Sequence, residues 1–243
     1  MDLVIDIGNS LHKIGLYSEE GELELFLQYD YLRKEDLEVL LSIYRVRHSI
    51  LSSVGKEDPG LKELLESETI FTHFSHESLL PVEIRYKNPQ SLGLDRIANA
   101  VAAHTEYAGE DILSIQAGTC LVYDFTDRNG IYHGGAISPG LNMRFQALNY
   151  FTEKLPLYSK REIDFLTGTS TQQSIESGVI NGVINEINGF MTQYEARYPG
   201  IKILLSGGDS AYLQKSIKNA IFVGSKFILN GLHKILKLNV ENL

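Results

Sequence analysis

The sequence predicts an α/β protein made of two similar halves. Short apolar strands alternate with segments in which apolar residues recur every three or four positions, the spacing of one helix face. A strand, a polar turn and a second strand open the chain, and a matching segment follows about 110 residues later. A repeat of that length is too long for a solenoid and is typical of a duplicated α/β half.

The first half is predicted to open with a β-hairpin and to continue with alternating helices and strands. Gly8-Asn9 is a strong turn signal between two apolar runs. Pro59 can open a helix, and Pro81 and Pro89 disfavour regular structure around them. In chain order we expect strands at 2–7 and 13–17, a helix at 34–44, a strand at 50–54, a helix at 59–67, an irregular connection at 80–89 and a helix at 95–104.

The second half begins near Gly109 and holds most of the glycines, which tolerate the tightest turns. The predicted elements are a strand from 112, a glycine-rich loop at 134–140, a long helix at 171–197 and a strand at 203–205 that runs into a diglycine turn. The 134–140 loop could bring its backbone close to a ligand or be a plain cluster of turns. Gly178 and Gly182 lie four residues apart in the long helix, so they could let another helix approach, as at a subunit interface.

Composition excludes several classes of function. The chain has 243 residues with 22 Lys+Arg against 31 Asp+Glu, a net charge of −9, so it has no general attraction to nucleic acid or to anionic lipid. Cys120 is the single cysteine and cannot form an internal disulfide. The N-terminus lacks the pattern of a signal peptide, and no apolar stretch is long enough to span a bilayer. We therefore expect a cytoplasmic protein that binds neither nucleic acid nor membrane.

The turn at Asp6-Ile7-Gly8-Asn9-Ser10 is the first candidate site. A strand-turn-strand of this kind points several backbone N–H groups at one place, which suits a phosphate. Asp6 could hold Mg²⁺ together with phosphate oxygens, and Lys13 could reach a phosphate as a point charge. The alternative is an ordinary hairpin turn.

The segment Gly93-Leu94-Asp95-Arg96 is the second candidate site. A carboxylate in the first turn of a helix stays ionised and can accept a proton from a substrate hydroxyl. Arg96 offers a planar fork that matches a substrate carboxylate. The alternative is an acidic helix start beside an exposed arginine.

Taken in order, the motifs of this chain resemble those of the type III pantothenate kinases, within the superfamily of acetate and sugar kinases, Hsp70 and actin. Each motif is weak alone, but the ordered set covers nearly the whole chain and is specific. The matching segments are Asp6-Ile7-Gly8-Asn9-Ser10 with Lys13, Tyr86-x-Asn88-Pro89, Gly93-Leu94-Asp95-Arg96 with Asn99, Gln116-Ala117-Gly118-Thr119-Cys120 with Asp124, Gly134-Gly135-x-Ile137-x-Pro139-Gly140, Thr171 with Ser177-Gly178, and Ser206-Gly207-Gly208-Asp209.

The resemblance implies a homodimer whose subunits have two ribonuclease-H-like (actin-like ATPase) domains, 1–108 and 109–243, with a cleft between them. Its implied activity is phosphorylation of pantothenate by ATP to 4'-phosphopantothenate, the first step of coenzyme A biosynthesis. Asp95 would be the general base, Asp6 would hold Mg²⁺, and Asp124 would bind a monovalent cation, K⁺ or NH₄⁺. The implied pantothenate-binding residues, with the pocket near the dimer interface, are Tyr86, Gly93, Leu94, Asp95, Arg96 and Thr171. The implied ATP-binding residues are Asp6, Ile7, Gly8, Asn9, Ser10, Lys13, Gly118 and Thr119.

One position departs from the family pattern. Gln116 stands where the family usually has aspartate, at the head of the second phosphate motif. Glutamine hydrogen-bonds but carries no charge, so a metal held near it loses one formal charge of attraction. This departure motivates an alternative function, a nucleotide- or pantothenate-binding regulatory relative with weakened catalysis. The presence of Asp6, Lys13, Asp95 and Arg96 favours the enzyme.

Overall fold

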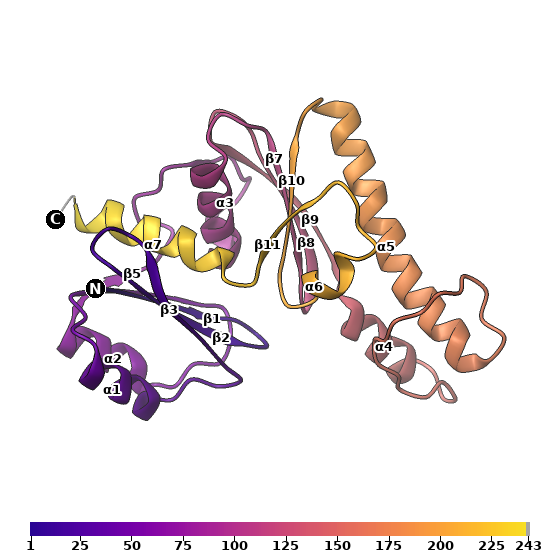
Figure 1. Cartoon of the computed structure of the whole chain (residues 1–243), viewed down its shortest axis with the longest axis horizontal. Helices are drawn as coiled ribbons and strands as arrows, with labels where there is room; N and C mark the ends of the chain where they lie inside the picture. Colours follow the sequence, from indigo (N-terminus) through magenta and orange to yellow (C-terminus); the bar gives the residue numbers. More distant parts are fainter. Residues whose placement is uncertain (242–243) are drawn as a thin grey trace. The chain divides into compact units, whose positions relative to one another are not determined.

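The computed structural model describes residues 1–241, which form two compact units (Figure 1). The first unit contains Met1–Gly109, Thr126–Gly134 and the chain from Lys226 onward, and the second contains Glu110–Phe125 and Gly135–Ser225. Each unit has its own buried core. The division into two ribonuclease-H-like domains at residue 108 stays a prediction.

A five-stranded sheet with the order β3-β2-β1-β4-β5 is the centre of the first unit. Its strands are β1 (Asp2–Ile7), β2 (His12–Tyr17), β3 (Leu23–Tyr29), β4 (His48–Ser53) and β5 (Ile70–His73). The central strand β1 is buried along its whole length and pairs antiparallel with β2 and parallel with β4. The register places Asp6 opposite Lys13 on one side and opposite Ser52 on the other.

Helices pack on the two faces of this sheet. They are α1 (Lys34–Ile43), α2 (Gly60–Glu68), α3 (Leu94–Glu106) and α7 (Phe227–Val240). Successive side chains of a strand point to opposite faces. Accordingly, Leu3 and Ile5 pack in one cluster with leucines of α1 and α2, whereas Val4 packs in another with apolar residues of α3 and α7. The apolar spacing of the predicted helices 34–44 and 95–104 is explained by these two buried faces.

A six-stranded sheet has the order β11-β10-β7-β8-β9-β6. Its strands are β6 (Glu83–Ile84), β7 (Ile112–Ala117), β8 (Cys120–Thr126), β9 (Ile131–Pro139), β10 (Lys202–Ser206) and β11 (Ile221–Gly224). Strand β10 runs parallel to β7, with Ser206 opposite Gln116. Strand β6 pairs with Ile131 and Tyr132 at the start of β9.

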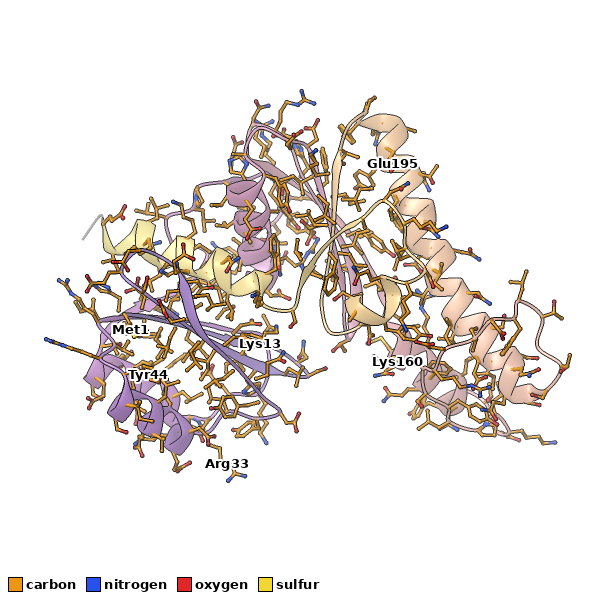
Figure 2. The ribbon with its side chains drawn as sticks, in the orientation of Figure 1. Met1, Lys13, Arg33, Tyr44, Lys160 and Glu195 are labelled. Carbon is orange, nitrogen blue, oxygen red and sulfur yellow. The ribbon has the colours of Figure 1, made fainter. Side chains whose placement is uncertain are left out.

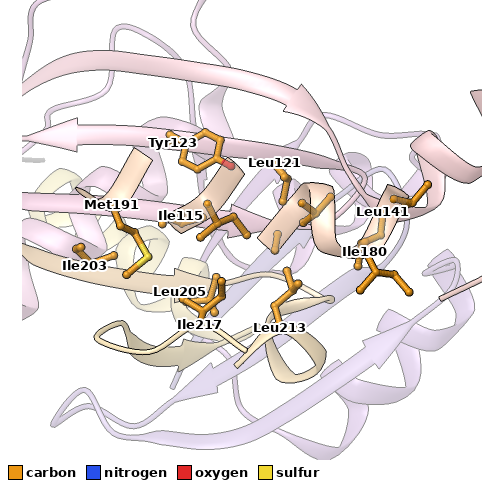
Figure 3. Packing of buried hydrophobic residues seen from close by; sticks show 14 of the residues in the cluster. Ile115, Leu121, Tyr123, Leu141, Ile180, Met191, Ile203, Leu205, Leu213 and Ile217 are labelled. Atoms are coloured by element: carbon orange, nitrogen blue, oxygen red, sulfur yellow. The ribbon is translucent and has the colours of Figure 1, made fainter. Parts of the chain in front are cut away.

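The second unit is held by a core between β7, β8 and β10 on one side and a long helix on the other. Its helices are α4 (Leu141–Tyr150), α5 (Thr171–Arg197) and the short α6 (Ser210–Leu213). Figure 3 shows Ile115, Tyr123 and Leu205 of the sheet gathered with Ile180 and Met191 of α5. The structure confirms the predicted helix 171–197.

The other predicted helices and strands are also confirmed within a few residues. The predicted loop at 134–140 is wrong, because residues up to Pro139 belong to β9. A Cβ atom on Gly135 would collide with the carbonyl oxygen of Tyr123, so this glycine serves close approach within the fold and not a turn. Across residues 1–241, no helix combines the length and the apolarity that a membrane crossing requires.

Candidate active site

The first predicted phosphate turn follows β1 and is fixed by its neighbours. The Gly8 N–H donates to the Leu11 carbonyl oxygen (3.2 Å), which closes the turn. The N–H groups of Val54 and Gly55, just after β4, both donate to the Ile7 carbonyl oxygen (3.0 and 3.1 Å). The turn is therefore held at the carboxyl end of the parallel β1–β4 pair, and Asn9 and Ser10 lie exposed at its tip.

Asp6 lies at the base of this turn with Lys13 beside it. The Lys13 Nζ atom is 2.8 Å from Asp6 Oδ2, and only 2 % of Asp6 is exposed. Figure 2 labels Lys13 on its strand. A nearly buried carboxylate at a strand end fits Mg²⁺ that also binds phosphate oxygens. Within residues 1–241 no group of three His, Cys, Asp or Glu side chains could hold a metal.

Two further buried groups lie near Asp6 and were not found from the sequence. Ser52, fully buried and in register with Asp6, has a hydroxyl with no hydrogen-bond partner in the described chain. His12 accepts a hydrogen bond at Nδ1 from the Leu32 N–H (3.0 Å). Burial lowers the pKa of His12, although the charge of Asp6 acts in the opposite direction.

The second predicted phosphate turn, Gly118-Thr119, joins β7 to β8. The Gly118 N–H donates to the Cys120 carbonyl oxygen (3.0 Å), and the Gly140 N–H donates to the Thr119 carbonyl oxygen (3.1 Å). The diglycine segment 206–209 also contacts the end of β7, because the Asp209 N–H donates to the Ala117 carbonyl oxygen (2.9 Å). Three motifs that are far apart in sequence therefore meet at the end of β7.

Polar side chains lie on the segments that meet at this turn and farther along β8. The Nε2 atom of Gln116 is buried and has no hydrogen-bond partner within residues 1–241. Asp209 is paired with the ammonium of Lys160. Asp124 lies on β8 and is 1 % exposed, so its charge is buried in the second unit. Burial raises the pKa of Tyr194, and the negative charge of Asp124 adds to this rise.

Asp95 is in the first turn of α3, as predicted. Gly93 is the N-cap residue, and the N–H groups of Arg96 and Ile97 donate to its carbonyl oxygen (3.1 and 3.3 Å). The Asp95 Oδ1 atom lies within 2.5 Å of the place that a Cβ on Gly93 would occupy. The carboxylate is thus turned back over the helix start, where the helix dipole favours negative charge.

The side chain of Arg96, in the first turn of α3, lies against the rings of two tyrosines. It is 6 % exposed, and its Cζ atom is 5.9 Å from the ring centroids of both Tyr86 and Tyr132. The alternative of an exposed arginine at the helix start is therefore wrong. Tyr132 was not predicted, because its approach to Arg96 depends on the pairing of β6 with β9, which has no local signal in the sequence.

Thr171 opens α5 and lines an open groove between α4 and α5 with a volume of about 900 Å³. Ser170 caps the helix by accepting a hydrogen bond from the Gln173 N–H (3.2 Å). The groove is largely apolar, and its lining includes Arg144, Leu148, Phe151, Leu155, Thr171, Ile175, Gly178 and Val179. Phe151 is 80 % exposed, so a large aromatic surface lies open beside Thr171.

Comparison with known structures agrees with the predicted fold class. The structure of a Campylobacter jejuni protein described as a Baf family transcriptional activator matches with a TM-score of 0.62 and 24 % identity, over 99 % of this chain and 100 % of that chain. A glucokinase from an Antarctic psychrotroph matches with a TM-score of 0.50 and 10 % identity, over 98 % of each chain. At these identities the matches show the fold alone, an α/β fold with one five-stranded and one six-stranded sheet.

Comparison of sequences is more specific. The family model of type III pantothenate kinase matches residues 2–193. A type III pantothenate kinase of Phocaeicola vulgatus is 40 % identical over 240 residues, 98 % of this chain and 99 % of the relative. That of Cytophaga hutchinsonii is 40 % identical over 240 residues, 99 % of this chain and 100 % of the relative. With its ordered motifs and its two glycine turns in place, the chain belongs to the type III pantothenate kinase family and carries that kinase activity.

Proposed function

We propose that Asp95 is the general base of the pantothenate kinase reaction and that Arg96 binds the pantothenate carboxylate. The observation that carries this proposal is their arrangement on α3, where Asp95 lies at the helix start and the guanidinium of Arg96 follows it against two tyrosine rings. A carboxylate in the first helical turn remains ionised and can accept the proton of the primary hydroxyl. The adjacent arginine would fix the far end of the same small substrate, with Tyr86, Gly93 and Leu94 around it.

The two glycine turns are proposed to bind ATP. Backbone N–H groups at Gly8-Asn9-Ser10 and at Gly118-Thr119 would donate to phosphate oxygens, and Lys13 would add a positive charge. Phosphoryl transfer depends mainly on positioning and on neutralising charge at the phosphate oxygens. Mg²⁺ bound with ATP would supply part of that neutralisation, and Asp6 is the residue proposed to hold it.

A monovalent cation, K⁺ or NH₄⁺, is proposed to bind at Asp124. The support is the place of Asp124 in the second phosphate motif of the family pattern and its position on β8 as a carboxylate with 1 % exposure. Replacing K⁺ by Na⁺ should therefore slow the enzyme, and the Asp124→Asn variant should lose this difference. Equal rates in K⁺ and Na⁺ for the unmodified enzyme would contradict the cation site.

A homodimer is proposed to form through the groove between α4 and α5. Phe151, which lines this groove, is 80 % exposed, and three other large apolar residues between α4 and α5 or at the end of α4, Tyr150, Leu157 and Leu166, are 81 %, 57 % and 76 % exposed. Gly178 and Gly182 have open space beside them, so a second copy of α5 could approach closely. Because Thr171 lines the groove, such a dimer would bring the partner close to a residue proposed to bind pantothenate.

The test of the proposed site is release of ADP from ATP with pantothenate, Mg²⁺ and K⁺, measured in a coupled assay. Omitting pantothenate should abolish release, and Arg96→Met should raise the KM for pantothenate while the KM for ATP stays constant. An equal rise in both KM values would show that Arg96 does not bind the carboxylate. The cytoplasmic location stays a prediction.

A further inference from the structure

Arg96 is 6 % exposed, and a charged side chain is rarely buried to this extent without favourable partners. A buried guanidinium loses its hydration, so the fold must surround it with groups that favour positive charge. Two of those groups are aromatic rings, whose faces attract a cation within about 6 Å of the centroid. Both rings, Tyr86 and Tyr132, lie 5.9 Å from Arg96 Cζ.

The three groups form a compact cluster with a defined shape. The two ring centroids are 6.3 Å apart with an interplanar angle of 47°, so with the 5.9 Å distances they make a nearly equilateral triangle with Arg96 Cζ. Both rings therefore lie on one side of the guanidinium. A side chain held in this way from one side has fewer rotamers open to it.

Backbone pairing fixes the positions of the two rings. Ile84 of β6 is in register with Tyr132 of β9, and the Arg85 N–H donates to the Tyr132 carbonyl oxygen (2.9 Å). Tyr86 follows immediately. Gly134 has a φ of +91°, and a Cβ atom there would lie 3.1 Å from Tyr86 Cε2, so glycine leaves room for that ring. The glycine that the sequence presented as part of a ligand loop thus accommodates Tyr86.

We propose that Tyr132 is a positioning residue for pantothenate binding, which together with Tyr86 holds the Arg96 guanidinium in the orientation that receives the substrate carboxylate. This inference rests on the proposed role of Arg96. Holding the fork in place before the substrate arrives removes an ordering cost from binding. Orienting the guanidinium in this way strengthens pantothenate binding in the ground state and in the transition state alike. It therefore lowers the KM for pantothenate and leaves kcat nearly unchanged.

The experiment compares three substitutions of Tyr132 by steady-state kinetics. Tyr132→Leu and Tyr132→Met remove the ring but keep apolar bulk, and we expect the KM for pantothenate to rise about 3- to 30-fold, the range of one cation–π contact. Tyr132→Phe keeps the ring face and should stay close to the unmodified enzyme. The KM for ATP should be constant throughout. Tyr132→Met provides the same test if the leucine variant does not fold.

The matched control is Tyr17→Leu. Tyr17 is also nearly fully buried in the same cluster of the first unit, but it stacks on His233 and not on Arg96. It should lose stability with no selective rise in the KM for pantothenate. A rise as large as that of Tyr132→Leu would overturn the proposal, as would an unchanged KM in Tyr132→Leu and Tyr132→Met, or a phenylalanine variant as impaired as these two.

A double substitution separates this inference from the proposed function. If Arg96 binds the carboxylate, Arg96→Met raises the KM for pantothenate, and adding Tyr132→Leu to it should raise KM little further. Additive effects would overturn the role of Tyr132 while leaving that of Arg96 intact. An Arg96→Met variant with unchanged KM would instead overturn the proposed role of Arg96, and this inference with it.

Discussion

The Lys13 ammonium lies 2.8 Å from the Asp6 carboxylate, and the side chains are 17 % and 3 % exposed. The antiparallel register of β1 and β2 places these two residues directly opposite each other. Asp6 is the residue proposed to hold Mg²⁺, so the ammonium of Lys13 would compete with that cation for the carboxylate. Phosphate oxygens of ATP offer Lys13 another partner. We therefore expect metal binding at Asp6 to depend on nucleotide.

Replacing Lys13 tests this competition. In Lys13→Met the carboxylate loses its counter-ion, so the affinity of the nucleotide-free protein for Mn²⁺ should rise at least about tenfold. The affinity for ATP should fall by a similar factor, because a phosphate contact is lost. Electron paramagnetic resonance of free Mn²⁺ measures the first effect and calorimetry the second.

The control for this experiment is Lys62→Met, which removes another lysine of the first unit that pairs with a carboxylate, Glu57, at 2.9 Å. It should change neither affinity. Mn²⁺ binding that is equally weak in Lys13→Met and in the unmodified protein would show that the ion pair does not limit access to Asp6.

Asp95 is expected to be required for chemistry and not for folding. Asp95→Asn keeps the size of the side chain but cannot accept the hydroxyl proton, so kcat should fall at least about 100-fold, the usual scale for a general base. The melting temperature and the KM for ATP should stay close to those of the unmodified enzyme. A loss smaller than about 100-fold would exclude Asp95 from this role.

Gln116 is expected to weaken the use of Mg²⁺. Its Nε2 atom is buried with no hydrogen-bond partner in the part of the chain that the structure describes, and the side chain carries no charge to attract a cation. Gln116→Asp should raise kcat or lower the Mg²⁺ concentration that gives half the maximal rate, by about 3- to 10-fold. Gln116→Asn, which is the size of aspartate but neutral, is the control. Identical Mg²⁺ titrations for the aspartate variant and the unmodified enzyme would show that this position does not handle metal.

The proposed dimer is tested at Phe151. A charge on this exposed aromatic would have to be buried in the interface, so Phe151→Glu should raise the dimer dissociation constant at least about 30-fold. Light scattering across a dilution series measures it. Val39→Glu, on α1 and 60 % exposed, is the control. A Phe151→Glu protein that stays dimeric at the same dilutions as the control would place the interface elsewhere.

The sequence was most informative for features that depend on neighbouring residues, such as the apolar spacing of a helix or the position of a residue at a helix start. The buried face of α5 follows from apolar residues three and four apart, and Asp95 is at a helix start, as its motif indicates. Sequence reasoning failed where long-range pairing decides. Gly134 and Gly135 look like turn residues, yet both lie inside β9, where one leaves room for the ring of Tyr86 and the other for the backbone of Tyr123.

Contacts between distant segments explain the residues that sequence reasoning missed. Tyr132 meets Arg96 only because β6 pairs with β9, and Ser52 comes beside Asp6 only because β4 pairs with β1. Neither residue has a periodic or motif signal of its own. The C-terminal α7 likewise joins the core of the first unit, although more than a hundred residues separate it from α3 in the chain.

Asp2 links three segments of the first unit and should give stability a specific dependence on pH. Its carboxylate accepts hydrogen bonds from His48 (2.9 Å) and His233 (3.0 Å), and Lys237 Nζ lies 3.5 Å away. Burial acts to raise the pKa of Asp2, but the histidine hydrogen bonds and the charges of Lys237 and His233 outweigh it and hold the pKa well below the ordinary value of 3.8.

A carboxyl group with a lowered pKa in the folded state stabilises the fold above its unfolded value, and this stabilisation is lost as the pH falls below it. Asp2→Asn should therefore lower the free energy of unfolding by about 1–3 kcal/mol at pH 7. The difference from the unmodified protein should shrink below pH 3.8, where the unmodified protein loses the same contribution. Urea unfolding between pH 3 and 7 measures both effects, with the exposed Glu66→Gln as control. A difference that stays constant across this range would mean that Asp2 contributes by packing and not by its charge.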